Sequence, residues 1–571
     1  MQPVPRIDED LFRPRHFRPP RPGAPVVVDE RHASTIETCR ARLVMVAAVF
    51  AAVFLVVTVR LLSMPLVLGG SGEGYAGRVR PAEPPPPVRA DIVDRNGQLL
   101  ATTLVAPSLY ADTRHIPDAR EAARAIMSVL PQLNAAELYE KLSSGKSFVW
   151  IKRRLTPTQQ YKVNSLGIPG LQFINEERRV YPFGDLASHV VGFSGIDNNG
   201  LAGIERALDE TVKSGAEPLQ LSIDARVQFI VHDELSKVIS DFTAKGGAAV
   251  VMDVNTGEII AMVSLPDFDP NHPGRVDPKL SPADAKERTF NKITLGAYEL
   301  GSVFKTFNTA MALDAGTATM TKQYDAVHNI SIGRFTITDY HGKHRYLSVP
   351  EVYMYSSNLG SARMALEAGA ERQRSFLGRL GLLKPVPIEF DEVAKPQFPK
   401  KWREVNVITI AYGHGIAVTP LHAITAVSAI VNGGILRPPT LRKLAPGEVP
   451  AGTRVISPKT SEQMRKLMRL VVQYGTAKKA AAPGYLVGGK TGTAEKNIGG
   501  HYYEKKLLSD FVGAFPMNNP RYALLLLVDE PHGNKKSFGY ATAGWTAAPA
   551  TGRIIERIRP LLGVPPVDEA S

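Results

Sequence analysis

The residues of this chain with the clearest potential for chemistry are Ser302 and Lys305, in the stretch GAYELGSVFKTFNTAMAL at 296–313. Beyond Leu300-Gly301 the apolar residues recur at helical spacing, which predicts that a helix begins near Ser302. Three residues apart on a helix, a serine hydroxyl and a lysine amine share one face. A lysine whose pKa is lowered by burial can remove the serine proton and create a nucleophile. The pattern alone is weak, because a helix-capping serine beside a solvated lysine has the same spacing, as does Ser143-Ser144-Gly145-Lys146.

Two further motifs follow in order along the chain. They are Ser356-Ser357-Asn358 and Lys490-Thr491-Gly492-Thr493. Penicillin-binding proteins and class A β-lactamases share a signature of three motifs in a fixed order: serine-x-x-lysine, a serine motif that ends in asparagine, and lysine-threonine-glycine. The chain resembles these families in all three motifs, the middle one in its looser serine-x-asparagine form. Their fixed order favours an enzyme that works through an acyl-serine intermediate.

The third motif has a rival interpretation as a nucleotide-binding loop. The residues GYLVGGKT at 484–491 match the P-loop pattern letter for letter. A P-loop must open a helix, so that its amides and the helix dipole meet the phosphates. The following TGTAEKNIGG has three glycines and no helical apolar period. We therefore expect a strand here, and nucleotide binding stays a minor alternative.

The resemblance implies a role for each catalytic residue. Ser302 would be the nucleophile and Lys305 its base, although the identity of the acylation base is disputed for this class of enzyme. Ser356 would relay a proton to the leaving or entering amine. Asn358 would hold Lys305 and the substrate amide. No metal or organic cofactor is expected.

The resemblance also implies a substrate-binding strand. Lys490 would pair with the terminal carboxylate of a substrate peptide. The residues expected to bind substrate beside it are Ser357, Thr491, Gly492 and Thr493. The threonine hydroxyls would reach the carboxylate, and the glycine would let the substrate backbone lie against the strand. The amides of Ser302 and Thr493 would form an oxyanion hole, in which each donor is worth roughly 2.7–4 kcal/mol.

Length and charge limit the remaining possibilities. A chain of 571 residues is long enough for two or three domains. Its net charge of +13 is dispersed and coincides with no nucleic-acid-binding motif, so nucleic acid is not an expected partner. Anionic lipid and cell wall are simpler surroundings for such a charge. Cys39 is the only cysteine, which excludes an intrachain disulfide.

The N-terminal part predicts a membrane anchor. Residues 1–42 are rich in proline and arginine and predict a disordered tail. Residues 43–64 include an uncharged apolar run that can cross about 30 Å of hydrocarbon. A cleaved signal peptide is the competing interpretation, but the run exceeds the usual apolar region of about 7–15 residues. The arginines of the tail place it in the cytoplasm by the positive-inside rule, with the rest of the chain outside the inner membrane.

Three further segments follow the anchor. Residues 65–88 combine a glycine-rich piece with a polyproline piece and predict a spacer. Residues 89–216 predict a pedestal module, with two amphipathic helices and a strand within 117–166 and no acid–base constellation. Residues 217–571 predict the catalytic module. Apolar strand patterns lie on both sides of its helical middle, which indicates an antiparallel sheet flanked by helices, an α+β fold. The resemblance implies the penicilloyl-serine transferase fold.

From the anchor to about residue 560 the chain is similar to class B penicillin-binding proteins, within them most of all to septal transpeptidases. RADIVDRNG at 89–97 resembles the entry motif of that class, and GHG at 413–415 and GWTAAP at 544–549 add to the likeness. Three positions depart from the usual pattern: Ala90, Leu300 and His414. The implied reaction is D,D-transpeptidation of peptidoglycan during septal cell-wall synthesis, with β-lactams acylating the same serine.

Partners follow from the same resemblance. They are stem peptides on lipid-linked nascent strands, a membrane-embedded glycosyltransferase of the FtsW type, other division proteins, and the membrane itself through one helix. The alternatives are an elongation-type transpeptidase, a carboxypeptidase that uses water, and a membrane-anchored β-lactam sensor or scaffold without turnover. The sequence leaves open the acceptor amine, the oligomeric state and activation by partners.

Overall fold

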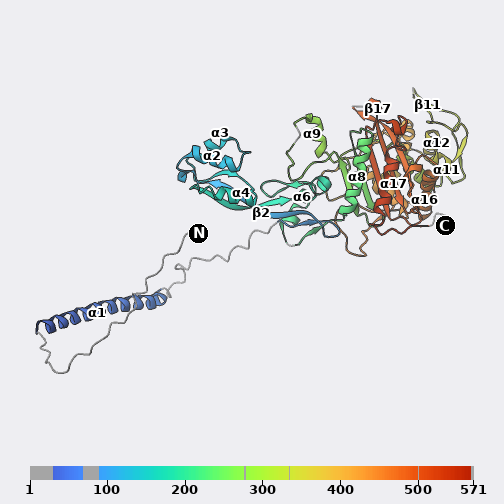
Figure 1. Ribbon diagram of the computed structural model, residues 1–571. Coiled ribbons are helices and arrows are strands. Elements are labelled where there is room, and N and C mark those ends of the chain that lie inside the picture. Colours follow the sequence, from blue (N-terminus) through green and yellow to red (C-terminus); the bar gives the residue numbers. More distant parts are fainter. Residues whose placement is uncertain are drawn as a thin grey trace, which may run out of the picture. The chain divides into compact units, whose positions relative to one another are not determined.

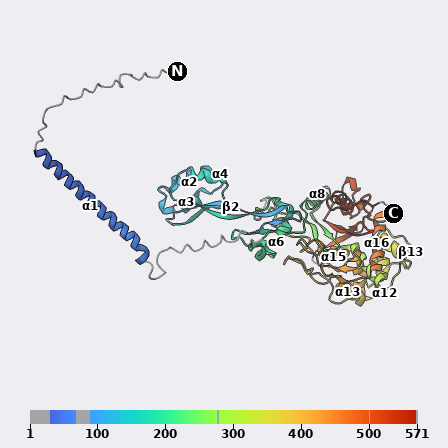
Figure 2. The same ribbon diagram turned by 90° about the horizontal axis from the view of Figure 1, so that it is seen from below.

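The computed structural model describes residues 30–67, 89–215, 217–275, 278–333, 335–498 and 501–567. These fall into two compact units, one before and one after the boundary at Pro85 and Pro86 (Figures 1 and 2). The expected spacer lies outside the described residues except for its first three, as do residues 1–29 of the expected tail.

The described part of the first unit is a long helix, α1 (Glu30–Val67). Its segment Arg40–Val59 has a mean hydropathy of 2.6 and is long enough to cross a membrane. The apolar side chains of 43–59 are exposed, whereas a core helix of a soluble protein would bury them. The helix begins earlier than the predicted start at residue 43, so 30–42 are helical and not disordered. This segment, ERHASTIETCRAR, contains neither proline nor glycine, so nothing in it interrupts the helix.

The second unit begins with an elongated pedestal. The strands of its sheet are β1 (Ile92–Val93), β2 (Leu99–Ala111), β3 (Val149–Lys152), β4 (Leu171–Val180) and β7 (Leu219–Gln220). Their order is β3-β2-β1-β7, and β4 also pairs with β2. Asn96-Gly97 forms the predicted turn between β1 and β2, and Gly97 has a φ of 85°. β7 pairs with β1, so the first strand assigned to the catalytic module belongs to the pedestal sheet.

A small separate core forms the head of the pedestal. Both amphipathic helices predicted within 117–166 are present as α2 (Ala119–Val129) and α3 (Ala135–Leu142), and the predicted strand is β3. A third helix, α4 (Pro157–Asn164), was not predicted. Its N-terminus is a capping box, in which Thr156 and Gln159 each accept a backbone amide of the other.

A buried ion-pair cluster closes the base of the pedestal. Glu205 accepts hydrogen bonds from Arg89 and Arg179, at 2.6 Å from each Nε, and all three residues are buried. The cluster joins the first pedestal residues, β4 and the short helices of this region. The short helices and the hairpin beside them are α5 (Ser188–Val191), β5 (Phe193–Ser194), β6 (Gly200–Ala202), α6 (Gly203–Ala207) and α7 (Asp209–Lys213).

The catalytic module contains the predicted antiparallel sheet. Its order is β16-β17-β18-β8-β9, with the strands β8 (Gly246–Asp253), β9 (Ile259–Leu265), β16 (Gly488–Ile498), β17 (His501–Phe515) and β18 (Tyr522–Asp529). Every residue of β18 is buried, which requires cover on both faces. α8 (Ala225–Asp241) and α17 (Ala547–Ile558) pack together on one face, and α15 (Pro420–Val431) and α16 (Pro458–Gln473) contact the sheet from the opposite side (Figures 1 and 2). This confirms the α+β fold.

The segment between β9 and β16 holds the helical middle of the module. Its remaining helices are α9 (Pro282–Thr289), α10 (Phe304–Asp314), α11 (Val349–Met354), α12 (Asn358–Ala368), α13 (Ala370–Arg379) and α14 (Glu404–Ala411). Short two-stranded antiparallel sheets accompany them: β10 (Gln323–Asp325) with β13 (Tyr346–Ser348), β11 (Ile330–Ile332) with β12 (Phe335–Ile337), and β14 (Ile435–Leu436) with β15 (Thr453–Arg454). α10 is buried from Phe304 to Leu313, which makes it a fixed central element.

Candidate active site

Ser302 lies in a tight turn directly before α10. Residues Gly301–Val303 form a single 3₁₀ turn, so the α-helix starts at Phe304, slightly later than predicted. Gly301 has a φ of 49°, a conformation that favours glycine. A Cβ at Gly413 would lie 2.0 Å from the Gly301 carbonyl oxygen, so the GHG segment is pressed against this turn. The backbone that leads into Ser302 is therefore closely packed.

Lys305 reaches Ser302 from the first turn of α10. Its Nζ lies 3.0 Å from Ser302 Oγ, 2.6 Å from the carbonyl oxygen of Ser356 and 2.7 Å from Asn358 Oδ1. Only 1% of the residue is exposed, and burial holds the pKa of Lys305 well below its ordinary value, with a further contribution from the charge of Lys490. A neutral amine has two hydrogens and one lone pair. The two acceptors at 2.6 and 2.7 Å can take both hydrogens, which leaves the lone pair for the Ser302 hydroxyl.

Ser356 stands between the two lysines. Its Oγ is 3.1 Å from Lys305 Nζ and 3.0 Å from Lys490 Nζ. The residue has a φ of 60°, which a non-glycine residue rarely adopts, and it joins the end of α11 to α12. The hydroxyl therefore bridges the two amines, where it can accept a proton from one and donate to the other.

The hydroxyl of Ser357 is held by contacts within the protein, and its predicted contact with substrate stays a prediction. Its side chain is buried, accepts the Gly360 amide as the N-cap of α12 and donates to Asp339 Oδ2 at 2.6 Å. Both hydrogen bonds are internal, so this serine shapes the loop. Its neighbour Asn358 accepts from Lys305 through Oδ1 and donates to the Thr338 carbonyl oxygen at 3.1 Å.

Lys490 lies on β16, the edge strand of the central sheet. The strand contradicts the P-loop alternative, because residues 488–498 form no helix. Its Nζ donates to Ser356 Oγ and to the Thr491 carbonyl oxygen, both at 3.0 Å. Burial lowers the pKa of Lys490 to about 7, although the nearby Asp510 raises it. With a pKa in this range, the charge of Lys490 depends on pH around neutrality, and its pairing with a substrate carboxylate stays a prediction.

The rest of the third motif is held by internal contacts. Thr491 Oγ1 lies 2.6 Å from Thr476 Oγ1, and Thr493 Oγ1 accepts the Ala543 amide at 3.1 Å. The predicted contacts of these hydroxyls with a substrate carboxylate stay a prediction. A Cβ at Gly492 would lie 2.4 Å from both Asp510 Oδ1 and the Leu300 carbonyl oxygen. Glycine is required here by the protein's own packing, in addition to the predicted approach of substrate.

Asp510 was missed by the sequence interpretation. It lies on β17 opposite Gly492, it is buried, and neither of its carboxyl oxygens has a hydrogen-bond partner among the described residues. Burial raises its pKa well above the ordinary value, against the opposing effect of Lys490. The available signal was a lone acidic residue in the apolar run LLSDFVGAF.

The family is decided by comparison with known protein families. The model of the penicillin-binding protein transpeptidase domain matches residues 247–555. The chain belongs to the penicillin-binding protein transpeptidases. The penicillin-binding protein dimerisation domain matches residues 84–230, a range that covers the pedestal and includes β7. Together the two domains make it a class B penicillin-binding protein, as the motifs predicted.

Relatives of this penicillin-binding protein are similar over most of its length. A probable peptidoglycan D,D-transpeptidase FtsI of Caulobacter vibrioides is 42% identical over 508 residues, which cover 87% of this chain and 84% of the relative. A probable peptidoglycan D,D-transpeptidase PenA of Neisseria gonorrhoeae is 32% identical and covers 84% and 86% of the two chains. The similarity therefore includes both the pedestal and the catalytic module.

Solved structures have the same fold. The transpeptidase domain of penicillin-binding protein 3 from Burkholderia pseudomallei is 32% identical, with a TM-score of 0.53 over 61% of this chain and 97% of that chain. Penicillin-binding protein 3 of Mycobacterium tuberculosis, solved with aztreonam, covers 85% of this chain and 98% of its own, with a TM-score of 0.65. At 24% identity the second likeness concerns the fold alone.

Proposed function

We propose that this protein is a peptidoglycan D,D-transpeptidase of septal cell-wall synthesis. The observation that carries the proposal is the Lys305 amine, whose hydrogens have two acceptors while its lone pair is left for Ser302. The names of the relatives supply the substrate class and the reaction. Penicillins and other β-lactams are ligands of the family and would acylate the same serine.

Acylation starts with transfer of the Ser302 proton to Lys305. The freed oxygen attacks the carbonyl carbon of the penultimate D-alanine of a stem peptide, and the oxyanion is held by the amides of Ser302 and Thr493. The bond from this carbon to the nitrogen of the last D-alanine then breaks. The leaving amine takes a proton from Lys305 through Ser356, whose hydroxyl contacts both lysines. The result is an acyl-serine, free D-alanine and a neutral Lys305.

Transpeptidation reverses this route with a different amine. An amine from a neighbouring strand attacks the ester carbon of the acyl-serine, and its proton passes through Ser356 to Lys305. The bond to Ser302 Oγ breaks, and the serine regains its proton from Lys305. Charged Lys490 binds the terminal carboxylate of the donor peptide before acylation. This ion pair contributes to binding only while the amine of Lys490 is protonated.

The septal role also defines the surroundings of the enzyme. Residues 43–64 anchor it in the inner membrane by one helix, the arginine-rich N-terminus faces the cytoplasm, and the catalytic module lies on the outer side. A membrane-embedded glycosyltransferase of the FtsW type would supply nascent strands, and other division proteins would recruit the pair. The support is the FtsI name of relatives at 42% identity and, in Escherichia coli, at 28%.

Two measurements test the proposal together. Fluorescent penicillin should label the full-length protein, fail to label Ser302→Ala and still label Ser143→Ala, the matched serine-x-x-lysine control. Purified protein given pentapeptide-bearing strands should release D-alanine and form crosslinks. Labelling of Ser302→Ala would refute the nucleophile. A side-wall pattern of a fluorescent fusion, in place of a midcell band, would refute the septal role and favour elongation.

A further inference from the structure

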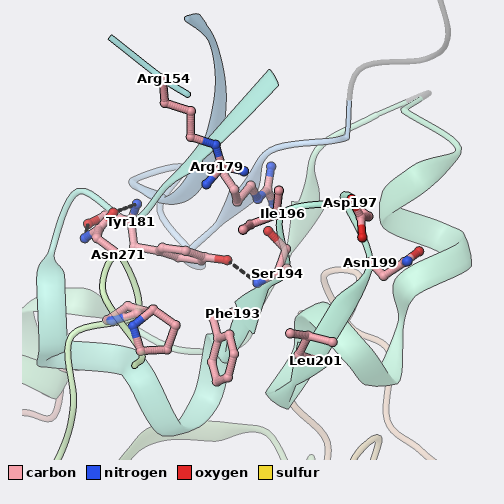
Figure 3. A pocket seen from close by; sticks show the side chains of 13 residues that line it. Arg154, Arg179, Tyr181, Phe193, Ser194, Ile196, Asp197, Asn199, Leu201 and Asn271 are labelled. Carbon is pink, nitrogen blue, oxygen red and sulfur yellow. Dashed lines mark hydrogen bonds between the residues drawn. The ribbon is translucent and has the colours of Figure 1, made fainter. Parts of the chain in front are cut away.

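A cavity of about 560 Å³ lies where the pedestal meets the catalytic module (Figure 3). It is lined from the pedestal by residues after β3, at the end of β4 and in the β5–β6 hairpin, and from the catalytic module by the loop 270–273. None of the catalytic candidates lines it. Its size is that of a pocket for a small molecule or a short peptide, since such pockets measure roughly 300–1,000 Å³.

Two arginines of the pedestal line this cavity. Arg179 is held in place by Glu205, and its Nη2 has no hydrogen-bond partner among the described residues. Arg154 is half-buried, and its guanidinium makes no hydrogen bond or ion pair with any residue that the structure describes. Burial and the charges of Arg153 and Arg178 lower the pKa of Arg154, and the opposing effects of Glu176 and Tyr181 offset this only in part. An anion that entered the cavity would provide the missing partner.

The backbone of Arg154 is itself constrained. Its φ is 58°, and its amide donates to Ser108 Oγ at 2.8 Å. A left-handed conformation is unfavourable for an arginine and persists only where the surroundings impose it, often at functional sites. The side chain of Arg154 lines the cavity, and Figure 3 shows Arg154 and Arg179 beside each other on one side, with Asp197 on the other.

The rest of the cavity provides apolar contact. Phe193 lies at its floor, and Ile196 and Leu201 are 59% and 51% exposed although both are large and apolar. Across from them, Asn271 exchanges two hydrogen bonds of 3.0 Å with the backbone of Tyr181 and so connects the two modules. A ligand here would touch both modules at this connection. A matching ligand would place a carboxylate beside Arg154 and an apolar or methyl-bearing part against the β5–β6 hairpin.

We propose that this cavity binds a short peptide through its free terminal carboxylate, with Arg154 as the anion contact and the β5–β6 hairpin as the apolar wall. Two sources offer this chemistry: the D-alanine end of a cell-wall stem peptide and the L-amino-acid C-terminus of a protein. Because the occupant contacts both the pedestal hairpin and the loop 270–273, it would stabilise one arrangement of the two modules.

Calorimetric titration of the full-length protein in detergent tests the proposal. The enzyme is first treated with penicillin to block Ser302, and then titrated with diacetyl-lysyl-D-alanyl-D-alanine, with its C-terminal amide, and with the L-alanyl-L-alanine form. We expect saturable binding of the acid, binding of the amide at least about tenfold weaker, and the same loss for the acid in Arg154→Ala, because a charge-assisted hydrogen bond is removed in each case. Arg154→Lys should recover part of the affinity.

Arg178→Ala is the matched control, because it removes a nearby positive charge that does not line the cavity. It should bind the acid as the wild type does, and thermal unfolding should verify that each variant is folded.

Preference for the D form would identify the cell wall as the source of the peptide. Equal or better binding of the L form would identify the C-terminus of a protein as the source, and either result supports the site. Equal affinity for acid and amide, no effect of Arg154→Ala, or no binding would overturn it. A chain that penicillin fails to acylate would refute the proposed function alone, since the Arg154 comparison does not depend on it.

Discussion

Asp510 and Lys490 face the same side of the central sheet from neighbouring strands. The register of β16 and β17 pairs Gly492 with Asp510 and Lys490 with Val512. Because side chains alternate along a strand, the carboxyl and the amine are diagonal neighbours on one face. Both are buried, and each shifts the pKa of the other toward its charged form. The ionisation of the lysine that would meet substrate is thus coupled to a carboxyl that no motif contains.

The first prediction concerns Asp510→Asn. Removing the carboxyl removes a group that favours the ammonium form of Lys490, so the pKa of this lysine should fall below its value of about 7. Acylation by carboxylate-bearing β-lactams needs the charged amine and decreases as pH rises through that pKa. We expect the alkaline limb of the second-order acylation rate to shift to lower pH, as measured by stopped-flow fluorescence. An unshifted limb would show that Asp510 stays neutral and does not control Lys490.

A second prediction concerns Lys305. Burial holds its pKa well below the ordinary value for a lysine, so the free base is more populated than in a solvated lysine, and the amine takes up its proton as pH falls. Acylation should therefore decline on the acidic side of the profile as this lysine takes up its proton. Lys305→Ala should slow acylation by about 10²–10⁴-fold, the usual worth of a general base. A loss below about tenfold in stopped-flow acylation would mean that another group accepts the Ser302 proton.

The third prediction is steric and uses a pair of glycines. A methyl group at Gly492 would collide with Asp510 Oδ1 and the Leu300 carbonyl oxygen, whereas a methyl group at Gly274 would meet nothing within 4 Å. Overpacking of a filled site costs about 1–3 kcal/mol. Gly492→Ala should therefore lower the thermal unfolding midpoint and impair penicillin labelling, because the Leu300 turn also holds Ser302. Gly274→Ala should change neither property. Equal behaviour of the two variants would contradict the packing at Gly492.

Much of the site was accessible from the sequence because its residues occur as short motifs. Ser302 and Lys305 are neighbours in the chain, and one helical turn brings them together. The contacts of Ser356 with both lysines depend on segments far apart in the chain, and only the recognised order of the motifs indicated them. The strands of the central sheet were predictable because their apolar runs are long and uninterrupted, as in ALLLLV within β18.

The features that the sequence did not reveal depend on register and on competition between local bonds. Asp510 became relevant only when the pairing of β16 with β17 placed it opposite Gly492. The sequence did not indicate that the hydroxyl of Ser357 makes an N-cap bond and donates to Asp339. The predicted boundary at residue 217 left β7 with the catalytic module although it pairs with β1, because a strand pattern of two residues does not specify its partner. No local pattern could have located the cavity beside Arg154, which is formed by four separate segments.

The last prediction separates the charge of Lys490 from its place in the strand. Acylation by a β-lactam that bears a carboxylate should depend on the ammonium form, whose pKa is about 7, and an uncharged methyl ester of the same compound should not. The acid should therefore show a bell-shaped pH profile, with Lys305 governing the acidic limb and Lys490 the alkaline limb. The ester should keep the acidic limb and lose the alkaline one. Lys490→Ala should slow acylation by the acid at least about tenfold more than acylation by the ester, since the substitution removes a charge-assisted contact worth about 1.5–3 kcal/mol. Equal losses for acid and ester would mean that Lys490 acts by holding Ser356 in place and does not bind the carboxylate.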